Sequence, residues 1–112
     1  MSIGKWGEDI AVSFLKKKGY KITERNYRSS FGEIDIIALH KGKLIFIEVK
    51  TRRTDEYGEP FEAIDSRKIE RIRNSALMYL RSLDKELPVR FDVVSITVGD
   101  DSHEVRHIDD AF

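Results

Sequence analysis

Two acidic residues and a lysine, Asp35, Glu48 and Lys50, have the types and the spacing that could do chemistry in this sequence. They lie in two apolar segments rich in β-branched residues, 33–39 and 44–51, which a short polar stretch with a glycine separates. Segments of this kind around a glycine-containing turn are typical of a β-hairpin. The sequence therefore predicts that the three residues lie on neighbouring strands.

The predicted register of this hairpin places the two carboxylates opposite each other. A two-residue loop and a four-residue loop give the same facing pairs, which are Leu39 with Leu44, Ile37 with Phe46, Asp35 with Glu48 and Glu33 with Lys50. Side chains alternate between faces with period two, so these pairs share one face. Two facing carboxylates would have Cβ atoms about 5 Å apart, where like charges destabilise a sheet, and at least one should have a raised pKa. A divalent cation removes this repulsion, and Mg²⁺ or Mn²⁺ prefers such hard oxygen ligands.

Lys50 lies two residues beyond Glu48 on the same predicted face, so its ammonium can lie beside the ion. There it could stabilise an attacking hydroxide or the charge that develops on a phosphate. A bound ion would lower the pKa of water and contact substrate oxygens, as hydrolysis of a phosphodiester requires. Two alternatives stay open: the carboxylates could form a structural polar cluster, and Glu33 could form a simple cross-strand ion pair with Lys50. A one-residue bulge in the hairpin would separate Asp35 from Glu48.

Periodicity along the chain predicts two helices and five strands, including this hairpin. Apolar residues at steps of three and four mark the helices, and alternating or continuous β-branched runs mark the strands. The expected elements are a helix at 3–15, an edge strand at 20–27, the hairpin strands, a loop at 52–60, a helix at 66–83, and strands at 91–98 and 104–108. This order predicts an α/β or α+β sandwich in which helices cover the faces of a mixed sheet.

Length and composition limit the class of protein. The 112 residues fit a single domain, 1–112. The 20 Lys and Arg residues balance the 20 Asp and Glu residues, so binding to nucleic acid would depend on local basic patches. The lack of cysteine excludes disulfides and thiolate chemistry. No apolar run resembles a signal peptide or approaches the ~20 residues of a membrane helix, so a cytoplasmic protein without membrane contact is expected.

Short motifs along the chain resemble a known nuclease superfamily. The motifs are Trp6-Gly7-Glu8, Asn26-Tyr27-Arg28, Gly32-Glu33-Ile34-Asp35, Glu48-Val49-Lys50 and Phe91-Asp92-Val93-Val94. The Asp followed by Glu-x-Lys, with a Glu in the first helix, resembles the PD-(D/E)XK nuclease superfamily. The whole chain is similar to the YraN-like family of small bacterial proteins, which is related to archaeal Holliday-junction resolvases. Ile34 stands where proline often precedes the Asp in the superfamily, at a position that contributes no ligand.

The resemblance implies a fold and a role for each site residue. The implied fold is an α/β, restriction-endonuclease-like mixed β-sheet flanked by helices, with an αβββαβ core and a C-terminal strand. Asp35 and Glu48 would be ligands of Mg²⁺ or Mn²⁺, the Val49 carbonyl would be a further ligand, and Lys50 would be the catalytic lysine. Glu8 corresponds to an acidic residue that such nucleases use near the metal. From the helical pattern alone, Glu8 lies at the margin of the apolar face, and a surface role is the alternative.

Four basic residues are candidates for binding the phosphates of nucleic acid. Lys68 and Arg71 lie three residues apart on the second predicted helix, off its apolar stripe, and in the similar nucleases this helix often directs a Lys or Gln toward the site. Arg52 and Arg53 follow the second hairpin strand and could contact phosphates. We expect these four to form the main positive patch beside the carboxylates, and the alternative is an ordinary solvated face. Asp92 is interpreted as structural.

The leading hypothesis from the sequence is a metal-dependent endonuclease that hydrolyses phosphodiester bonds in DNA, with branched or single-stranded DNA among its substrates. The alternative from another class is a non-catalytic nucleic-acid-binding or DNA-repair module that keeps the nuclease fold. A third hypothesis is a metal-dependent hydrolase of RNA or of a small phosphate ester. A domain of this size offers a limited footprint, so a homodimer is expected on a two-stranded or four-way substrate.

Overall fold

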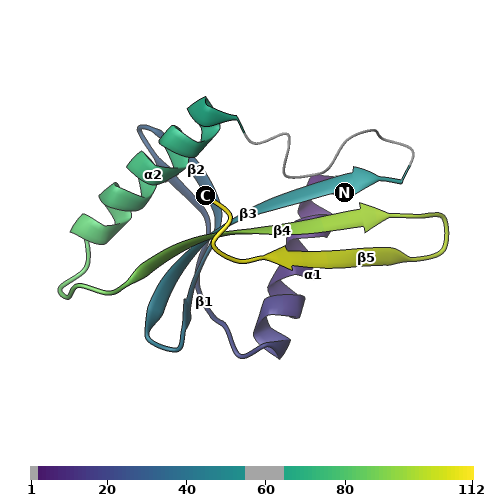
Figure 1. Ribbon diagram of the computed structural model, residues 1–112, viewed down its shortest axis with the longest axis horizontal. Helices are drawn as coiled ribbons and strands as arrows, with labels where there is room; N and C mark the ends of the chain where they lie inside the picture. Colours follow the sequence, from purple (N-terminus) through teal and green to yellow (C-terminus); the bar gives the residue numbers. More distant parts are fainter. Residues whose placement is uncertain (1–2, 55–64) are drawn as a thin grey trace.

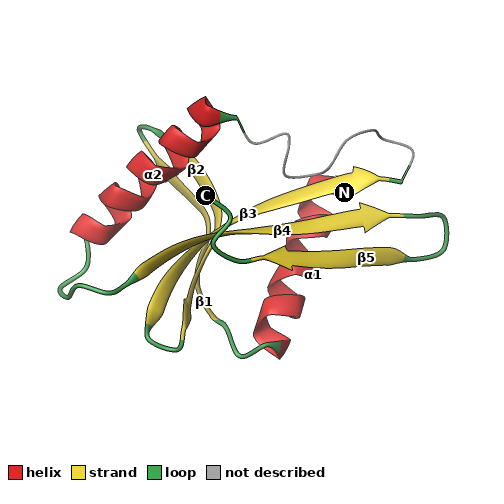
Figure 2. Cartoon of the chain, viewed as in Figure 1, coloured by secondary structure: helices red, strands yellow, loops and turns green. Residues whose placement is uncertain are grey.

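One five-stranded mixed sheet and two flanking helices make up the computed structural model, which describes residues 3–54 and 65–112 (Figures 1 and 2). The elements in chain order are α1 (Ile3–Lys17), β1 (Lys21–Ser29), β2 (Gly32–His40), β3 (Lys43–Arg53), α2 (Ser66–Arg81), β4 (Val89–Val98) and β5 (His103–Ile108). The predicted α/β architecture, an αβββαβ core with a C-terminal strand, is confirmed, and it is consistent with a restriction-endonuclease-like fold. Neither helix of the described part is long and apolar enough to cross a membrane.

Strand β3 is the centre of the sheet. The strand order is β1-β2-β3-β4-β5, and β3 pairs antiparallel with β2 but parallel with β4. A parallel pair needs a crossover connection, and α2 lies within the connection from β3 to β4. The first turn of α2 therefore lies beside the C-terminal half of β3, where Lys68 contacts Glu48.

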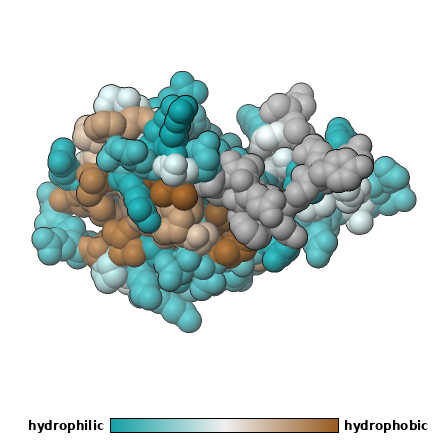
Figure 3. All heavy atoms as spheres, turned by 45° about the horizontal axis from the view of Figure 1, so that its top comes forward, coloured by the Kyte–Doolittle hydropathy of each residue, from teal (hydrophilic) through white to brown (hydrophobic). Residues whose placement is uncertain are grey.

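The two helices pack against different sets of strand residues and so give the sheet two hydrophobic cores. The core under α1 includes Ala11, Leu15, Ile36, Ile45, Ile47, Val94 and Ile96. The core under α2 includes Ile34, Ile37, Leu44, Phe46, Ile72 and Ala76. Strand β3 contributes to both cores through its continuous buried run 44–48, which is typical of a strand covered on both faces. Figure 3 shows hydrophobic side chains also reaching the surface on the half of the molecule that carries α2.

The start of α1 packs directly on the end of β3 at Gly7. A Cβ atom at this position would overlap Thr51 Oγ1, so a larger residue would require the helix or the strand to shift. The neighbouring Trp6 packs against the α1 core and makes an edge-to-face contact with His103, with 5.4 Å between the ring centroids. The motif Trp6-Gly7-Glu8 therefore fixes the position of the helix that carries Glu8.

One predicted boundary affects the candidate site. The sequence predicts that a loop begins at Arg52, but β3 continues through Arg53, because β4 pairs beside it as far as Val98. The rest of the predicted loop, 55–60, lies outside the described residues. The other element boundaries agree with the prediction to within two residues.

Asp92 is structural, as the sequence predicts. Its fully buried carboxylate accepts hydrogen bonds from Arg90 Nε at 2.9 Å and Nη2 at 2.8 Å, from His107 Nε2 at 2.7 Å and from the Asp110 N–H at 3.1 Å. Arg90 also donates to the Tyr20 hydroxyl at 2.9 Å. Burial works to raise the pKa of Asp92, but these hydrogen bonds outweigh it and hold the pKa at about 2. The network fastens β4 to β5 and stays outside the pocket described next.

Candidate functional site

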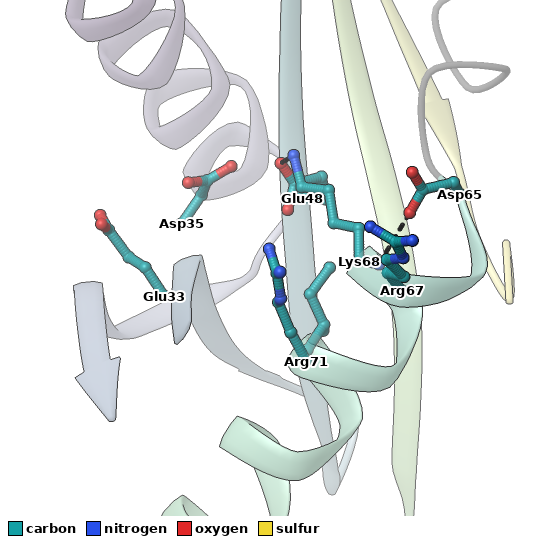
Figure 4. Close-up of a pocket in the computed structure, with 8 residues that line it drawn as sticks. Glu33, Asp35, Glu48, Asp65, Arg67, Lys68 and Arg71 are labelled. Atoms are coloured by element: carbon teal, nitrogen blue, oxygen red, sulfur yellow. Dashed lines mark hydrogen bonds and ion pairs between the residues drawn. The ribbon is translucent and has the colours of Figure 1, made fainter. Parts of the chain in front are cut away.

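A pocket of about 530 Å³ lies beside the C-terminal half of β3, between the start of β2 and the first turns of α2 (Figure 4). Most of its lining is charged, and the lining residues are Glu33, Asp35, Glu48, Asp65, Arg67, Lys68, Arg71 and Ile72. Apart from Asp65, the acidic side chains come from the sheet, and the basic side chains come from α2 (Figure 4). The pocket therefore has an acidic side and a basic side.

The β2–β3 hairpin has the predicted register over its paired length, which includes Leu39 with Leu44 and Ile37 with Phe46. Counted from the turn, the regular ladder ends at the pair Ile36 with Ile47, which is one residue short of Asp35. The predicted ladder pair of Asp35 with Glu48 is therefore not formed. Toward this end, β2 diverges from β3, which continues beside β4 (Figure 1). Beyond the ladder, the Val49 N–H of β3 has a side-chain acceptor on β2 in place of a backbone carbonyl. It donates to Asp35 Oδ2 at 2.8 Å.

The carboxylates of Asp35 and Glu48 nevertheless converge, and the pKa of Asp35 reflects their proximity. Burial raises this pKa most, the charge of Glu48 raises it further, and the hydrogen bond from Val49 opposes both in part, so that the pKa reaches about 7. Glu48 is itself 6% exposed. The predicted raised pKa of at least one carboxylate is confirmed. A buried and a half-buried carboxylate at short range oppose folding, and this arrangement is typical of a functional site.

Two lysines compensate the charge of this carboxylate pair. Lys68 Nζ, from the first turn of α2, lies 2.8 Å from Glu48 Oε1. Burial works to lower the pKa of Lys68, but the hydrogen bond to Glu48 contributes to a net increase. The pKa of Lys50 is lowered by burial and by the neighbouring Lys68 ammonium, although Glu48 and Asp35 oppose this change. Lys68 thus contacts Glu48 directly, and Lys50 lies within reach of the charges of Lys68, Glu48 and Asp35 without being among the residues that line the pocket.

Glu8 lies near the site but belongs to an ion pair of its own. Its Oε1 is 3.8 Å from Arg25 Nη2, and the same guanidinium nitrogen binds Asp9 at 2.7 Å. The charge of Glu8 is among the causes of the raised pKa of Asp35. Among the described residues, no three His, Cys, Asp or Glu side chains form a group that could hold one ion. The structure thus brings Asp35 and Glu48 together without Glu8, whose role as a ligand stays a prediction.

Glu33 does not form the predicted cross-strand pair with Lys50. It lies opposite Arg28 in the β1–β2 hairpin, and its Oε2 is 3.7 Å from Arg28 Nε. Lys50 lies opposite Ser95 of β4, because β3 has left β2 at this level. Glu33 still lines the edge of the pocket, so it offers a carboxylate close to the site but outside the converging pair.

The structure brings two of the four predicted phosphate-binding residues to the pocket. Lys68 and Arg71 line it, as predicted. Arg52 and Arg53 are the last two residues of β3 and do not belong to the described lining. Two of the four thus line the pocket, and the part of the patch that Arg52 and Arg53 would form beside it stays a prediction.

Arg67 contributes to the basic side of the pocket, and sequence reasoning missed it. Asp65 is the N-cap of α2 and accepts a hydrogen bond from the Lys68 N–H at 2.9 Å. Basic residues in the first turn of a helix oppose the helix dipole. An Asp N-cap followed, after Ser66, by Arg67 and Lys68 was the available signal, because cations placed there need an anionic partner.

The mixed sheet, its flanking helices and the charged pocket beside β3 define an α/β protein with an architecture consistent with restriction endonucleases. Residues 7–96 match the family described as Uncharacterised protein family UPF0102, and the chain belongs to this family. This confirms the YraN-like resemblance. The matched range contains Asp35, Glu48, Lys50 and Lys68.

Full-length relatives support the family assignment. A UPF0102 protein of Syntrophomonas wolfei is 44% identical over 111 residues, which cover 98% of this chain and 96% of the relative. A UPF0102 protein of Syntrophotalea carbinolica is 47% identical over 114 residues, which cover 100% of this chain and 92% of the relative. A UPF0102 protein of Thermodesulfovibrio yellowstonii is 43% identical over 112 residues, with 100% and 96% coverage.

Proposed function

We propose that this protein is a metal-dependent phosphodiesterase that cleaves nucleic acid, with DNA as its substrate. The observation that carries the proposal is the convergence of Asp35 and Glu48 in a pocket whose other side is basic, where burial and then the charge of Glu48 raise the pKa of Asp35 to about 7. Folding does not require this repulsion, and a divalent ion would remove it. Carboxylate oxygens at short range are also the donor set that Mg²⁺ or Mn²⁺ prefers.

The residues near the start of β2 and in the middle of β3 fit such an ion. Asp35 and Glu48 would hold it. The Val49 carbonyl is a further candidate, because a residue in an extended strand directs its N–H and C=O to the same edge, and the Val49 N–H already faces Asp35. A bound ion would supply a water molecule of lowered pKa and would offset charge on the phosphate. Glu8 would add negative potential, and would become a ligand only after leaving Arg25.

Lys50 is the residue best placed to act on the reacting groups. The charges of Lys68, Glu48 and Asp35 all act on its ammonium, although Lys50 is not among the residues that line the pocket. A positive charge held there would stabilise the negative charge that develops on the phosphate or on the attacking hydroxide. Because its pKa is lowered, Lys50 would also release a proton more readily than an ordinary lysine.

The basic side of the pocket supports a phosphate substrate. Arg67, Lys68 and Arg71 come from the first two turns of one helix and line the same pocket. Helix N-termini and arginine side chains are common partners of phosphate groups. The chain has no net charge, so this local patch would have to supply most of the attraction for nucleic acid.

The test is a cleavage screen of the purified protein on labelled linear duplex, single-stranded and branched DNA and on RNA, with Mg²⁺, Mn²⁺ or a chelator. We expect cleavage of DNA with either ion and none with the chelator. Asp35→Asn and Lys50→Ala should lower the rate by about a hundredfold or more. Glu33→Gln is the matched control, since it removes a carboxylate of the same pocket that pairs with Arg28 instead, and it should keep activity.

Two outcomes would reject parts of this proposal. If the protein binds DNA but cleaves no substrate with either ion, the non-catalytic module is the better interpretation. If RNA is cleaved and DNA is not, the ion site stands and the substrate is wrong.

A further inference from the structure

Lys68 occupies the carboxylate that the proposed site needs for its ion. Lys68 Nζ lies 2.8 Å from Glu48 Oε1, and the Glu48 side chain is 6% exposed, so little of this carboxylate is open to another ligand. An ammonium group and a divalent ion on the same carboxylate repel each other at such short range. Lys68 and the ion therefore compete for Glu48.

The charges around Glu48 lead to the same conclusion. The Glu48 carboxylate and the Lys68 ammonium form a neutral ion pair without a metal. Arg67 and Arg71 add two positive charges to the lining of the same pocket. A divalent ion placed on Glu48 would add further positive charge, which is unfavourable unless Lys68 moves away and an anion enters with the ion. A phosphodiester is an anion of the required kind.

Lys68 is able to leave Glu48. Its side chain is 37% exposed and ends a flexible four-carbon stem. It stands in the first turn of α2, where the helix dipole disfavours a cation. Asp65 binds the Lys68 backbone N–H, not the ammonium, in the described contacts. A phosphate beside Arg67 and Arg71 would be a suitable partner for the released ammonium.

We propose that Lys68 couples the binding of the ion to the binding of a substrate phosphate. Without substrate, Lys68 holds Glu48, and the ion binds weakly. With a phosphate in the pocket, Lys68 contacts the phosphate, and Glu48 becomes available to the ion. This inference rests on the proposed function and adds a regulation to it. The bound ion raises the affinity of the protein for nucleic acid, and bound nucleic acid raises its affinity for the ion, because coupling between two ligands is reciprocal.

Calorimetric titration of Mn²⁺ into the ion-free full chain tests this coupling with the wild type and two variants. Lys68→Met keeps most of the aliphatic stem and removes the competing charge. Arg67→Met is the matched control, because it removes one charge from the same helical turn and leaves the Glu48 contact in place. We expect Lys68→Met to bind Mn²⁺ about tenfold more tightly than the wild type, and Arg67→Met to stay within about twofold.

A second titration adds a short phosphorothioate-linked DNA oligomer, which resists cleavage, with Mn²⁺ binding by the oligomer alone subtracted. The oligomer should raise the Mn²⁺ affinity of the wild type about fivefold or more, and that of Lys68→Met much less. The first effect measures the coupling, and its reduction in the variant assigns the coupling to Lys68.

The outcomes separate this inference from the proposed function. If Lys68→Met binds Mn²⁺ no more tightly than a wild type that does bind it, the coupling is overturned and the ion site stands. If neither protein binds Mn²⁺, with or without the oligomer, the ion site itself is wrong and the coupling fails with it. Binding by Lys68→Met where the wild type shows none would support the coupling in its strongest form.

Discussion

Asp35→Asn should stabilise the ion-free protein at pH 8 and leave it little changed at pH 4. The pKa of Asp35 is about 7 in the folded protein, against an ordinary value of 3.8. A carboxyl group whose pKa is raised by folding contributes its full stability below 3.8, and this contribution is lost as the pH rises toward 7. At about 1.4 kcal/mol per pKa unit, the loss amounts to at most about 4 kcal/mol at pH 8. Asparagine carries no charge and can still accept the Val49 N–H, so the variant should escape this loss.

Urea unfolding in the presence of a chelator, followed by the fluorescence of the single tryptophan, Trp6, measures this effect between pH 4 and 8. The difference in the free energy of unfolding between wild type and variant isolates Asp35, because the other titrating groups largely cancel. Glu33→Gln, whose carboxylate is 40% exposed, should follow the wild-type curve. A difference that stays flat with pH, or that favours the wild type as the pH rises, would refute the raised pKa of Asp35 that burial and the charge of Glu48 produce.

Three further predictions concern stability and binding. The pKa of Asp92 is about 2 in the folded protein, against an ordinary value of 3.8. Its carboxylate should therefore contribute roughly 2.5 kcal/mol to the free energy of unfolding above pH 4, and this contribution is lost as the pH falls toward 2. Acid unfolding of Asp92→Asn should lack this loss, and an unchanged curve would contradict the hydrogen-bond network of Asp92. Gly7→Ala should lower the free energy of unfolding by about 1–3 kcal/mol through overpacking, and adding Thr51→Ala should recover part of it; an equally stable single variant would show that α1 is free to shift. Replacing Arg67 and Arg71 by methionine should weaken DNA binding and reduce the slope of log affinity against log salt by about one for each lost phosphate contact; an unchanged slope would place the DNA elsewhere.

The secondary structure was predictable because its signals are local. The continuous apolar run 44–47 indicates a strand covered on both faces, and β3 has this environment. The hairpin register was correct as far as Ile36 with Ile47, because a short turn fixes it. Beyond that point the register depends on β4, a strand that is distant in the sequence. The local pattern could not show that Asp35 would bind the Val49 N–H instead of facing Glu48 across a ladder.

The acidic side of the candidate site was predictable, and much of its basic side was not. Asp35 and Glu48 lie between apolar residues of two strands. A carboxylate is unusual in such segments, so the sequence alone indicates a special role for both residues. The contact of Lys68 with Glu48 depends on where the crossover places the first turn of α2, which periodicity does not fix. For the same reason, Arg67 was missed, and Arg52 was expected at a pocket that it does not line.

A crystal of the protein soaked in excess Mn²⁺, measured near the manganese absorption edge, tests most directly whether the pocket beside β3 is a metal site. We predict an anomalous difference peak bound by Asp35 and Glu48, with Lys68 Nζ displaced from its present position 2.8 Å from Glu48 Oε1. The same soak of Asp35→Asn should give a much weaker peak or none, because one of the two charged ligands is gone. If neither a wild-type crystal nor a Lys68→Met crystal soaked in the same way shows a peak at these carboxylates, the assignment of this pocket as a metal site is contradicted.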